Sequence, residues 1–241
     1  FGKTKLQDTD DGSHNQFVPI KRLLSGELAN TIQAAVELDA WLARIFSFYH
    51  PRGTDASDHI TQSVDWLGQA AEQLADAEVV GGIEIEPNLV GETAETLVEI
   101  MRQLHASGHT NMVLVPDGGN ISAMNKSSDE VRRQFQLMHK YMGWAHIKDY
   151  AIDPALSWDG AVDEERLKNF VPADEGDSGH ATLLRDMRAV IPKRTRAMTK
   201  LGVPGFFLET EPHLKGGGQF GGFSGPDGMG VAVRALCSTL D

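Results

Sequence analysis

Polar side chains that could do chemistry stand at the ends of four apolar segments of this sequence. The segments are 83–88 with two glutamates, 115–120 with an aspartate, 144–149 with a histidine and a lysine, and 208–213 with two more glutamates. If these segments are parallel strands of an α/β barrel, their carboxyl ends form its active face. Three carboxylates and one imidazole could then converge.

A mixed set of oxygen and nitrogen ligands suits a divalent ion such as Mn, Mg, Co or Zn and not a metal selected by thiolates. A single carboxylate at a strand end is more often a solvated or capping group than a ligand. The joint pattern therefore carries the prediction of a metal site.

The elements that must position these groups alternate between helix and strand. Apolar residues recur at helical spacing in some segments and form short continuous runs in others. Thr93 and Ser128 are expected N-caps, because their hydroxyls can accept a hydrogen bond from an otherwise unpaired backbone N–H group. We expect helices at 25–38, 60–74, 93–104, 128–142, 183–190 and 228–240, strands at 42–49, 79–86, 111–116, 144–149, 167–173 and 205–211, and a long loop at 151–166.

Strict alternation of this kind implies a parallel sheet, since each right-handed crossover returns the chain to the same edge. The expected strands number six, fewer than those of a (β/α)8 TIM barrel. If the fold is such a barrel, its first two strands lie before Phe1. We therefore expect residues 1–241 to form one TIM-barrel domain that is incomplete at its N-terminus.

Composition narrows the partners and the compartment. The net charge of −12 disfavours a nucleic-acid partner, because phosphate binding needs clustered lysine and arginine. No apolar run approaches the ~20 residues of a membrane span. The single Cys237 cannot form an internal disulfide, and its apolar helical neighbours predict a buried thiol in a reducing compartment. We expect a cytoplasmic protein with no membrane partner, which could be a homo-oligomer.

In this order, the motifs resemble those of the xylose isomerase-like TIM barrels of the sugar phosphate isomerase/epimerase family. The resemblance covers most of the chain and rests on Glu84-Ile85-Glu86, Gly91-Glu92-Thr93, Asp117-Gly118-Gly119-Asn120, His146-Ile147-Lys148-Asp149, Pro172-Ala173-Asp174-Glu175-Gly176-Asp177, Glu211-Pro212-His213-Leu214 and Gly221-Gly222-Phe223-Ser224-Gly225-Pro226.

The resemblance implies that Glu84, Asp117, His146 and Glu211 hold one divalent metal ion. Glu209 shares a strand face with Glu211; Glu211 is preferred because Pro-His-Leu follows it. The implied activity is isomerisation or epimerisation of a small sugar, sugar phosphate or related keto compound. Glu84 and Glu211 would act as acid and base beside a carbonyl polarised by the metal.

Five further residues are expected to contact the substrate: Lys148, Asn120, Glu86, Arg44 and Glu175. Lys148 could hold an anionic oxygen, or it could neutralise the acidic cluster through Asp149 or Glu175. Arg44 could bind a carboxylate or phosphate of the substrate, or satisfy neighbouring carboxylates.

Other readings stay open. The same site could serve a metal-dependent lyase or dehydratase acting on a sugar or inositol-like substrate, or the barrel could bind a metabolite without turnover. A multi-zinc nuclease is disfavoured, since only His146 among the histidines is well placed. The run 215–222 could be a lid or a phosphate-binding loop, although a flexible connector is the simpler reading. His213 could support the ligand Glu211, and the remaining histidines are not assigned.

Overall fold

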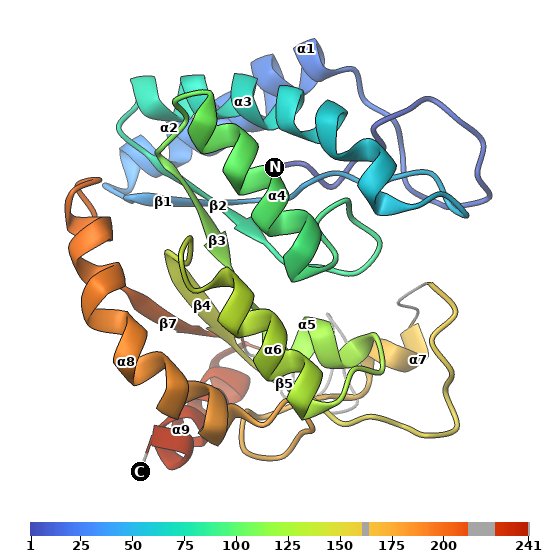
Figure 1. Ribbon diagram of the computed structural model, residues 1–241, viewed down its shortest axis with the longest axis vertical. Coiled ribbons are helices and arrows are strands. Elements are labelled where there is room, and N and C mark those ends of the chain that lie inside the picture. Colours follow the sequence, from blue (N-terminus) through green and yellow to red (C-terminus); the bar gives the residue numbers. More distant parts are fainter. Residues whose placement is uncertain (161–163, 212–224, 241) are drawn as a thin grey trace.

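In the computed structural model, parallel strands form a curved central layer wrapped by helices (Figure 1). The structure describes residues 1–160, 164–211 and 225–240. Strands β1 (Leu42–Ile45), β2 (Val80–Glu84) and β3 (Met112–Val115) form a parallel sheet in the order β1-β2-β3. The sequence prediction of parallel βα units is confirmed in this half of the molecule.

Two more strands continue the curve. Strand β4 (Trp144–Ile147) pairs in parallel with β7 (Phe207–Thr210). Parallel bridges at Leu114–Met142 and Asp117–His146 connect β3 to β4. At the outer ends of the curve, Trp41 stacks on Phe207 with ring centroids 6.5 Å apart, so the strands bend towards one another as in a barrel.

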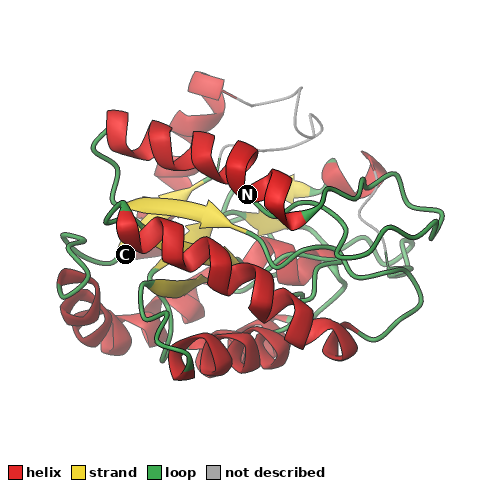
Figure 2. Cartoon of the chain, turned by 90° about the horizontal axis from the view of Figure 1, so that it is seen from above, coloured by secondary structure: helices red, strands yellow, loops and turns green. Residues whose placement is uncertain are grey.

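The helices lie outside the strands on both sides, and loops gather at one end, on the right in both views (Figures 1 and 2). That end carries the carboxyl termini of the parallel strands. The helical elements are α1 (Ile20–Leu23), a π-helical turn (Leu24–Leu28), α2 (Ala29–Glu37), a 3-10 turn (Ala56–His59), α3 (Ile60–Asp76), α4 (Ala94–Ala106), α5 (Gly118–Ala123), α6 (Ser128–Met138), α7 (Glu164–Leu167), α8 (His180–Thr199) and α9 (Gly225–Leu240).

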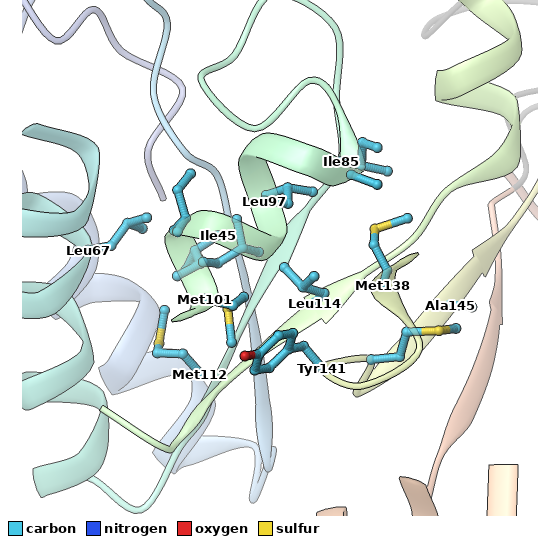
Figure 3. Packing of buried hydrophobic residues seen from close by; sticks show 14 of the residues in the cluster. Ile45, Leu67, Ile85, Leu97, Met101, Met112, Leu114, Met138, Tyr141 and Ala145 are labelled. Atoms are coloured by element: carbon cyan, nitrogen blue, oxygen red, sulfur yellow. The ribbon is translucent and has the colours of Figure 1, made fainter. Parts of the chain in front are cut away.

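The apolar positions read from the sequence form the core between helices and strands. Leu97 and Met101 of α4 pack near Leu114 of β3 and Ile45 of β1, all fully buried (Figure 3). Removing each such side chain from water contributes roughly 1.5–3 kcal/mol. This core fixes the strands, and the strands fix the residues at their ends.

The first residues of the chain lie beside the segment that follows β1. The Phe46 N–H group donates to the Phe1 carbonyl at 2.8 Å, and Tyr49 donates to Thr4 at 2.9 Å. Gly2 adopts a φ of +101°, and a Cβ there would lie 2.3 Å from the Phe46 carbonyl oxygen. Glycine is needed at this close approach between backbones.

The strand predicted at 167–173 is wrong as a barrel strand. Only Phe170–Val171 (β6) is extended, and it pairs in antiparallel fashion with β5 (Asp149–Tyr150). A parallel partner needs a crossover that packs back on the sheet. Between β5 and β6 the described chain has loop and the single turn of α7, which falls at the end of the predicted loop, so the chain returns as a hairpin.

Two smaller expectations are also corrected, and one helix was missed. The N-cap of α6 is Ser127, whose side chain accepts from the Glu130 N–H group, and not Ser128. Cys237 is exposed, because it lies on the outer side of α9, whereas Ala232 and Ala235 face inward. Helix α5, which begins directly after Asp117, was not predicted.

The Thr93 cap of α4 is confirmed. Among the described helices, none combines the length and hydropathy required to cross a bilayer.

Gly82 in β2 makes room for the indole of Trp144 from β4. A Cβ at Gly82 would lie 2.0 Å from the ring, and Trp144 is only 2% exposed, so the ring cannot move into solvent. We expect Gly82→Ala to lower the free energy of unfolding by about 1–3 kcal/mol, the usual cost of overpacking. Urea denaturation followed by circular dichroism measures this change.

Gly26 is a matched control, because a Cβ there meets no atom within 4 Å. Gly26→Ala should leave stability unchanged or raise it slightly through the higher helix propensity of alanine. Equal stability of the Gly82→Ala variant and the parent would contradict the proposed contact.

Candidate metal centre

Four side chains meet at the carboxyl ends of the parallel strands. Glu84 ends β2, Asp117 follows β3, His146 lies in β4 and Glu211 follows β7. One nitrogen or oxygen atom from each lies within 4.8 Å of the others, and all four residues are buried. The predicted cluster therefore assembles, while its role in holding a metal stays a prediction.

Local structure explains how these groups are aimed. Asp117 caps α5, where its Oδ1 accepts from the Asn120 N–H group at 3.0 Å, and this leaves Oδ2 directed at the cluster. The parallel bridge between Asp117 and His146 sets their two positions side by side. Sequence spacing alone does not give this pairing, because it depends on how β3 and β4 meet.

The His146 ring presents one nitrogen to all three acids. Nδ1 lies 2.9 Å from Glu84 Oε1, 3.5 Å from Glu211 Oε1 and 3.7 Å from Asp117 Oδ2. In this structure Nδ1 lies within hydrogen-bonding distance of Glu84 Oε1. The same nitrogen and three oxygens are the donor set that borderline and hard divalent ions bind.

Lys148 and Arg44 supply positive charge to the cluster. Lys148 Nζ lies 3.0 Å from Asp117 Oδ2 and also contacts Glu211 Oε2. Arg44 reaches Glu211 Oε1 at 2.8 Å and Glu84 Oε2 at 3.2 Å. Both cations thus neutralise the acids, which is the second of the two roles considered for each from the sequence. The partners expected for Lys148, Asp149 and Glu175, are wrong.

Two acidic oxygens fit an additional ligand. Glu84 Oε2 and Asp117 Oδ2 are buried without a hydrogen bond from any described residue, although Arg44 and Lys148 lie within 3.2 and 3.0 Å of them. The two cations are close enough to attract these oxygens but are not aligned to donate to them. A buried acceptor without a donor costs roughly 1–3 kcal/mol, and a bound cation would remove this cost. The residues present therefore fit a divalent ion.

Burial and charge act against each other on the ionisation of these groups. Burial raises the pKa of Glu84. Burial also acts to raise the pKa of Asp117, but the charge of Lys148, the contact with His146 and the Asn120 N–H group together outweigh it and lower that pKa. Burial acts to lower the pKa of His146, but the acids Glu84, Asp117 and Glu209 together overcome it, so this pKa stands well above its ordinary value. A histidine that binds a metal through Nδ1 carries no proton on that nitrogen, so metal binding and proton binding compete there.

A cavity of about 410 Å³ opens next to the cluster. Glu84 and Glu211 line it, and so do four of the residues predicted to contact substrate: Arg44, Glu86, Asn120 and Lys148. Its size falls in the range of small-molecule sites.

Three of the predicted contact residues have informative surroundings. Asn120 donates to Glu84 Oε1 at 3.1 Å, so its amide also orients a predicted ligand. Glu86 pairs with Lys3 at 2.5 Å. Glu175 is exposed and lies outside the cavity lining, so its position gives no support to the predicted substrate contact.

Glu209 was considered as a ligand from sequence and takes a different place. It is the cross-strand partner of His146 in the β4–β7 pair, and its Oε2 lies 3.3 Å from Nε2 of that ring. Nε2 is the nitrogen opposite the acid cluster. A carboxylate at this nitrogen fixes the orientation and tautomer of a histidine ligand and raises its basicity.

His180 and Asp149 hold the backbone beside Lys148 and were not predicted to do so. His180 Nε2 donates to the Lys148 carbonyl at 2.7 Å, and Asp149 Oδ1 accepts from the Ser178 N–H group at 2.9 Å. A Cβ at Gly176 would lie 2.3 Å from Asp149 Cγ, which explains the glycine. The Pro172–Asp177 motif therefore packs behind the site. In the sequence, His180 ends the Gly-Asp-Ser-Gly-His run at 176–180, and no spacing in that run indicates a contact with Lys148.

Several predictions fall outside the described residues. These are the role of His213, the function of the run 215–222, and residues 221–224 of the last family motif. The remaining two residues of that motif, Gly225 and Pro226, lie at the start of α9.

A curved layer of parallel strands enclosed by helices, with acids and a histidine at the carboxyl ends, defines the class of TIM-barrel proteins. Residues 26–190 match the family model described as xylose isomerase-like TIM barrel. The chain belongs to this family, which confirms both the resemblance and the fold class. Among curated proteins, none matches this sequence.

Solved structures show the same fold at low identity. A D-tagatose 3-epimerase-like protein is 17% identical over 97% of this chain and 74% of its own, with a TM-score of 0.60. The IolI protein with a zinc atom is 14% identical over 98% of this chain and 73% of its own, with a TM-score of 0.59. A xylose isomerase-like TIM barrel protein from Mycobacterium smegmatis, in complex with magnesium, is 17% identical over 92% of this chain and 71% of its own, with a TM-score of 0.56.

If the cluster holds a metal, the different positions of Glu211 and Glu209 should give different losses of metal affinity on mutation. Glu211→Gln removes a proposed ligand charge and should give the larger loss of Mn²⁺ affinity. Glu209→Ala removes only the support of His146 and should weaken binding by about tenfold, the lower end for such supporting residues. Isothermal titration calorimetry measures both.

Glu72 is exposed on α3 and provides a control, since Glu72→Gln should bind Mn²⁺ as the parent does. A larger loss in Glu209→Ala than in Glu211→Gln would exchange the roles of the two glutamates.

Removing Lys148 tests the charge balance of the cluster without a metal. Lys148 is 6% exposed, and Lys148→Met leaves Asp117 and Glu211 with less positive charge in a buried place. We expect the metal-free variant to lose about 3 kcal/mol of unfolding free energy. Saturating Mn²⁺ should recover a large part of this loss, as measured by urea denaturation. An equal loss with and without Mn²⁺ would contradict the shared charge balance.

Proposed function

We propose that this chain is a divalent-metal-dependent isomerase or epimerase of a small sugar, sugar phosphate or related keto compound. The observation that carries the proposal is the meeting of Glu84, Asp117, His146 and Glu211 beside a cavity at the carboxyl ends of the strands. The names of two structural neighbours support it, since one is an epimerase-like protein and another holds zinc.

The four residues would hold the ion. When bound, a divalent cation would polarise a carbonyl or hydroxyl oxygen of the substrate and stabilise the negative charge that develops when the adjacent C–H bond loses its proton. Mn, Mg, Co and Zn all suit this donor set.

Glu84 and Glu211 are the proposed acid and base. Both line the cavity, and one nitrogen of Arg44 lies 3.2 Å from an oxygen of Glu84 and 2.8 Å from an oxygen of Glu211. One carboxylate takes the proton from carbon, and the C–H electron pair moves to the neighbouring carbonyl to give an enediolate. The other carboxylic acid returns a proton. Return to the opposite face of the same carbon gives epimerisation. Return to the adjacent carbon, with the hydroxyl proton passing from one substrate oxygen to the other, interconverts aldose and ketose.

The neighbouring cavity residues would bind and orient the substrate. Lys148 would donate to an anionic oxygen of the substrate, and Arg44 to a second oxygen beside the two glutamates. Asn120 and Glu86 would hydrogen-bond hydroxyl groups. Each of these residues lines the cavity. The partner we propose is therefore a small carbohydrate, bound within one domain formed by the chain.

Proton exchange with solvent tests the function directly. The full chain loaded with Mn²⁺ should incorporate deuterium from heavy water into ketoses, inososes or keto sugar acids, as followed by proton NMR. Glu211→Gln and Glu84→Gln should each reduce this exchange by about a hundredfold or more, because each removes one proton carrier.

The exposed control Glu72→Gln should exchange at the parental rate. Net loss of water from the substrate would instead assign a lyase. Sugar binding without any exchange, with each of the four divalent ions, would leave a binding barrel and sink the proposal.

A further inference from the structure

A second cavity adjoins the first on the side away from the acid cluster. Its volume is about 330 Å³. Asn15, Tyr49 and Arg52 line both cavities, whereas Glu84 and Glu211 line only the first. The two cavities are therefore neighbours, an inner one at the acid cluster and an outer one that shares Asn15, Tyr49 and Arg52 with it.

The outer cavity has an aromatic wall and a polar rim. Trp158 is half-buried and lines it together with Glu92 and the residues shared with the inner cavity. In the described part of the chain, neither the Asn15 amide nor the Arg52 guanidinium has a hydrogen-bond partner. A planar apolar face beside free polar donors suits a ring with C–H groups on one face and hydroxyls around its edge.

The loop that carries Trp158 is held in place. The buried Arg166 donates to the Ala123 carbonyl at 3.0 Å and also contacts the Ser157 carbonyl, while its guanidinium lies 5.2 Å from the Trp158 ring centroid. Asn125 donates to the Leu156 carbonyl at 2.6 Å. These bonds tie the 151–160 loop to the end of α5, whose Ala123 lines the inner cavity. A preorganised aromatic side chain binds at a lower entropic cost than a mobile one.

We propose that the outer cavity is a subsite for a second sugar ring, so that the substrate is a ketose or keto sugar extended at its far end by a glycosyl group. The reactive end would lie at Glu84 and Glu211, and the second ring would stack on Trp158 and hydrogen-bond to Asn15 and Arg52. This assignment rests on the proposed function for the placement of the reactive end. It also gives the long 151–160 segment a role in substrate size.

Three sugars that differ only at one end test the subsite. D-fructose, fructose phosphorylated on its terminal oxygen, and isomaltulose, which carries a glucosyl group on that oxygen, share the same reactive end. Isothermal titration calorimetry with the Mn²⁺-loaded full chain should show isomaltulose binding about tenfold more tightly than fructose. Trp158→Ala should remove this preference and leave fructose affinity unchanged.

Two variants complete the design. Trp158→Phe keeps an aromatic face and should keep most of the preference. Trp41→Ala removes an exposed tryptophan that stacks on Phe207 and lines neither cavity, and it should change no affinity.

The proposal is overturned if isomaltulose binds no better than fructose or does not bind, or if Trp158→Ala weakens both sugars equally. It is also overturned if only the phosphorylated sugar gains affinity, which would make the outer cavity an anion site. Deuterium exchange separates this outcome from the fate of the proposed function. Trp158-dependent binding without exchange keeps the subsite and removes the isomerase, whereas exchange with fructose and no binding of isomaltulose does the reverse.

Discussion

Three carboxylates buried within a few ångströms of one another are the constraint on which the rest of this site depends. Glu84, Asp117 and Glu211 would repel strongly away from water unless positive charge lay among them. Lys148 and Arg44 provide that charge in this structure, and the His146 ring lies among the same acids. Each of these three bases comes from a parallel strand or its immediate end, so the electrostatic balance and the strand arrangement are inseparable.

The packing beneath the site holds the His146 ring against these carboxylates. The Trp144 indole occupies the space left by Gly82 and lies within 3.2 Å of His146 Nε2 through its ring nitrogen. Glu209 lies at that same Nε2 from the neighbouring strand. The imidazole therefore contacts Trp144 and Glu209 with one nitrogen and faces the acids with the other. A ligand held in this way loses little freedom when a metal binds.

Much of this arrangement follows from sequence because strand ends are marked by abrupt changes from apolar to acidic residues. The positions of Glu84, Asp117, His146 and Glu211 were predicted on that basis and from the family resemblance, and they do converge. The support of His146 by Glu209 depends on the cross-strand register of β4 and β7, which no local pattern reveals.

Other features could not be predicted from the sequence because they also depend on tertiary contacts. Phe170 and Val171 have the composition of a strand, but tertiary context makes them half of a short hairpin. His180 contacts a backbone carbonyl, and such a contact leaves no signature in residue type or spacing. The exposure of Cys237 depends on which face of α9 meets the core, and the apolar residues around it did not settle that face.

The cations that neutralise the acids also line the cavity, and this links metal binding to substrate binding. Lys148 and Arg44 are each held by two carboxylates in this structure. A divalent ion shared by those carboxylates would take over much of the neutralisation, which weakens the hold on both side chains. Their N–H groups would then be available to oxygens of a ligand in the cavity. Metal and sugar should therefore favour each other's binding, and because coupling of this kind is reciprocal, sugar should also tighten the metal.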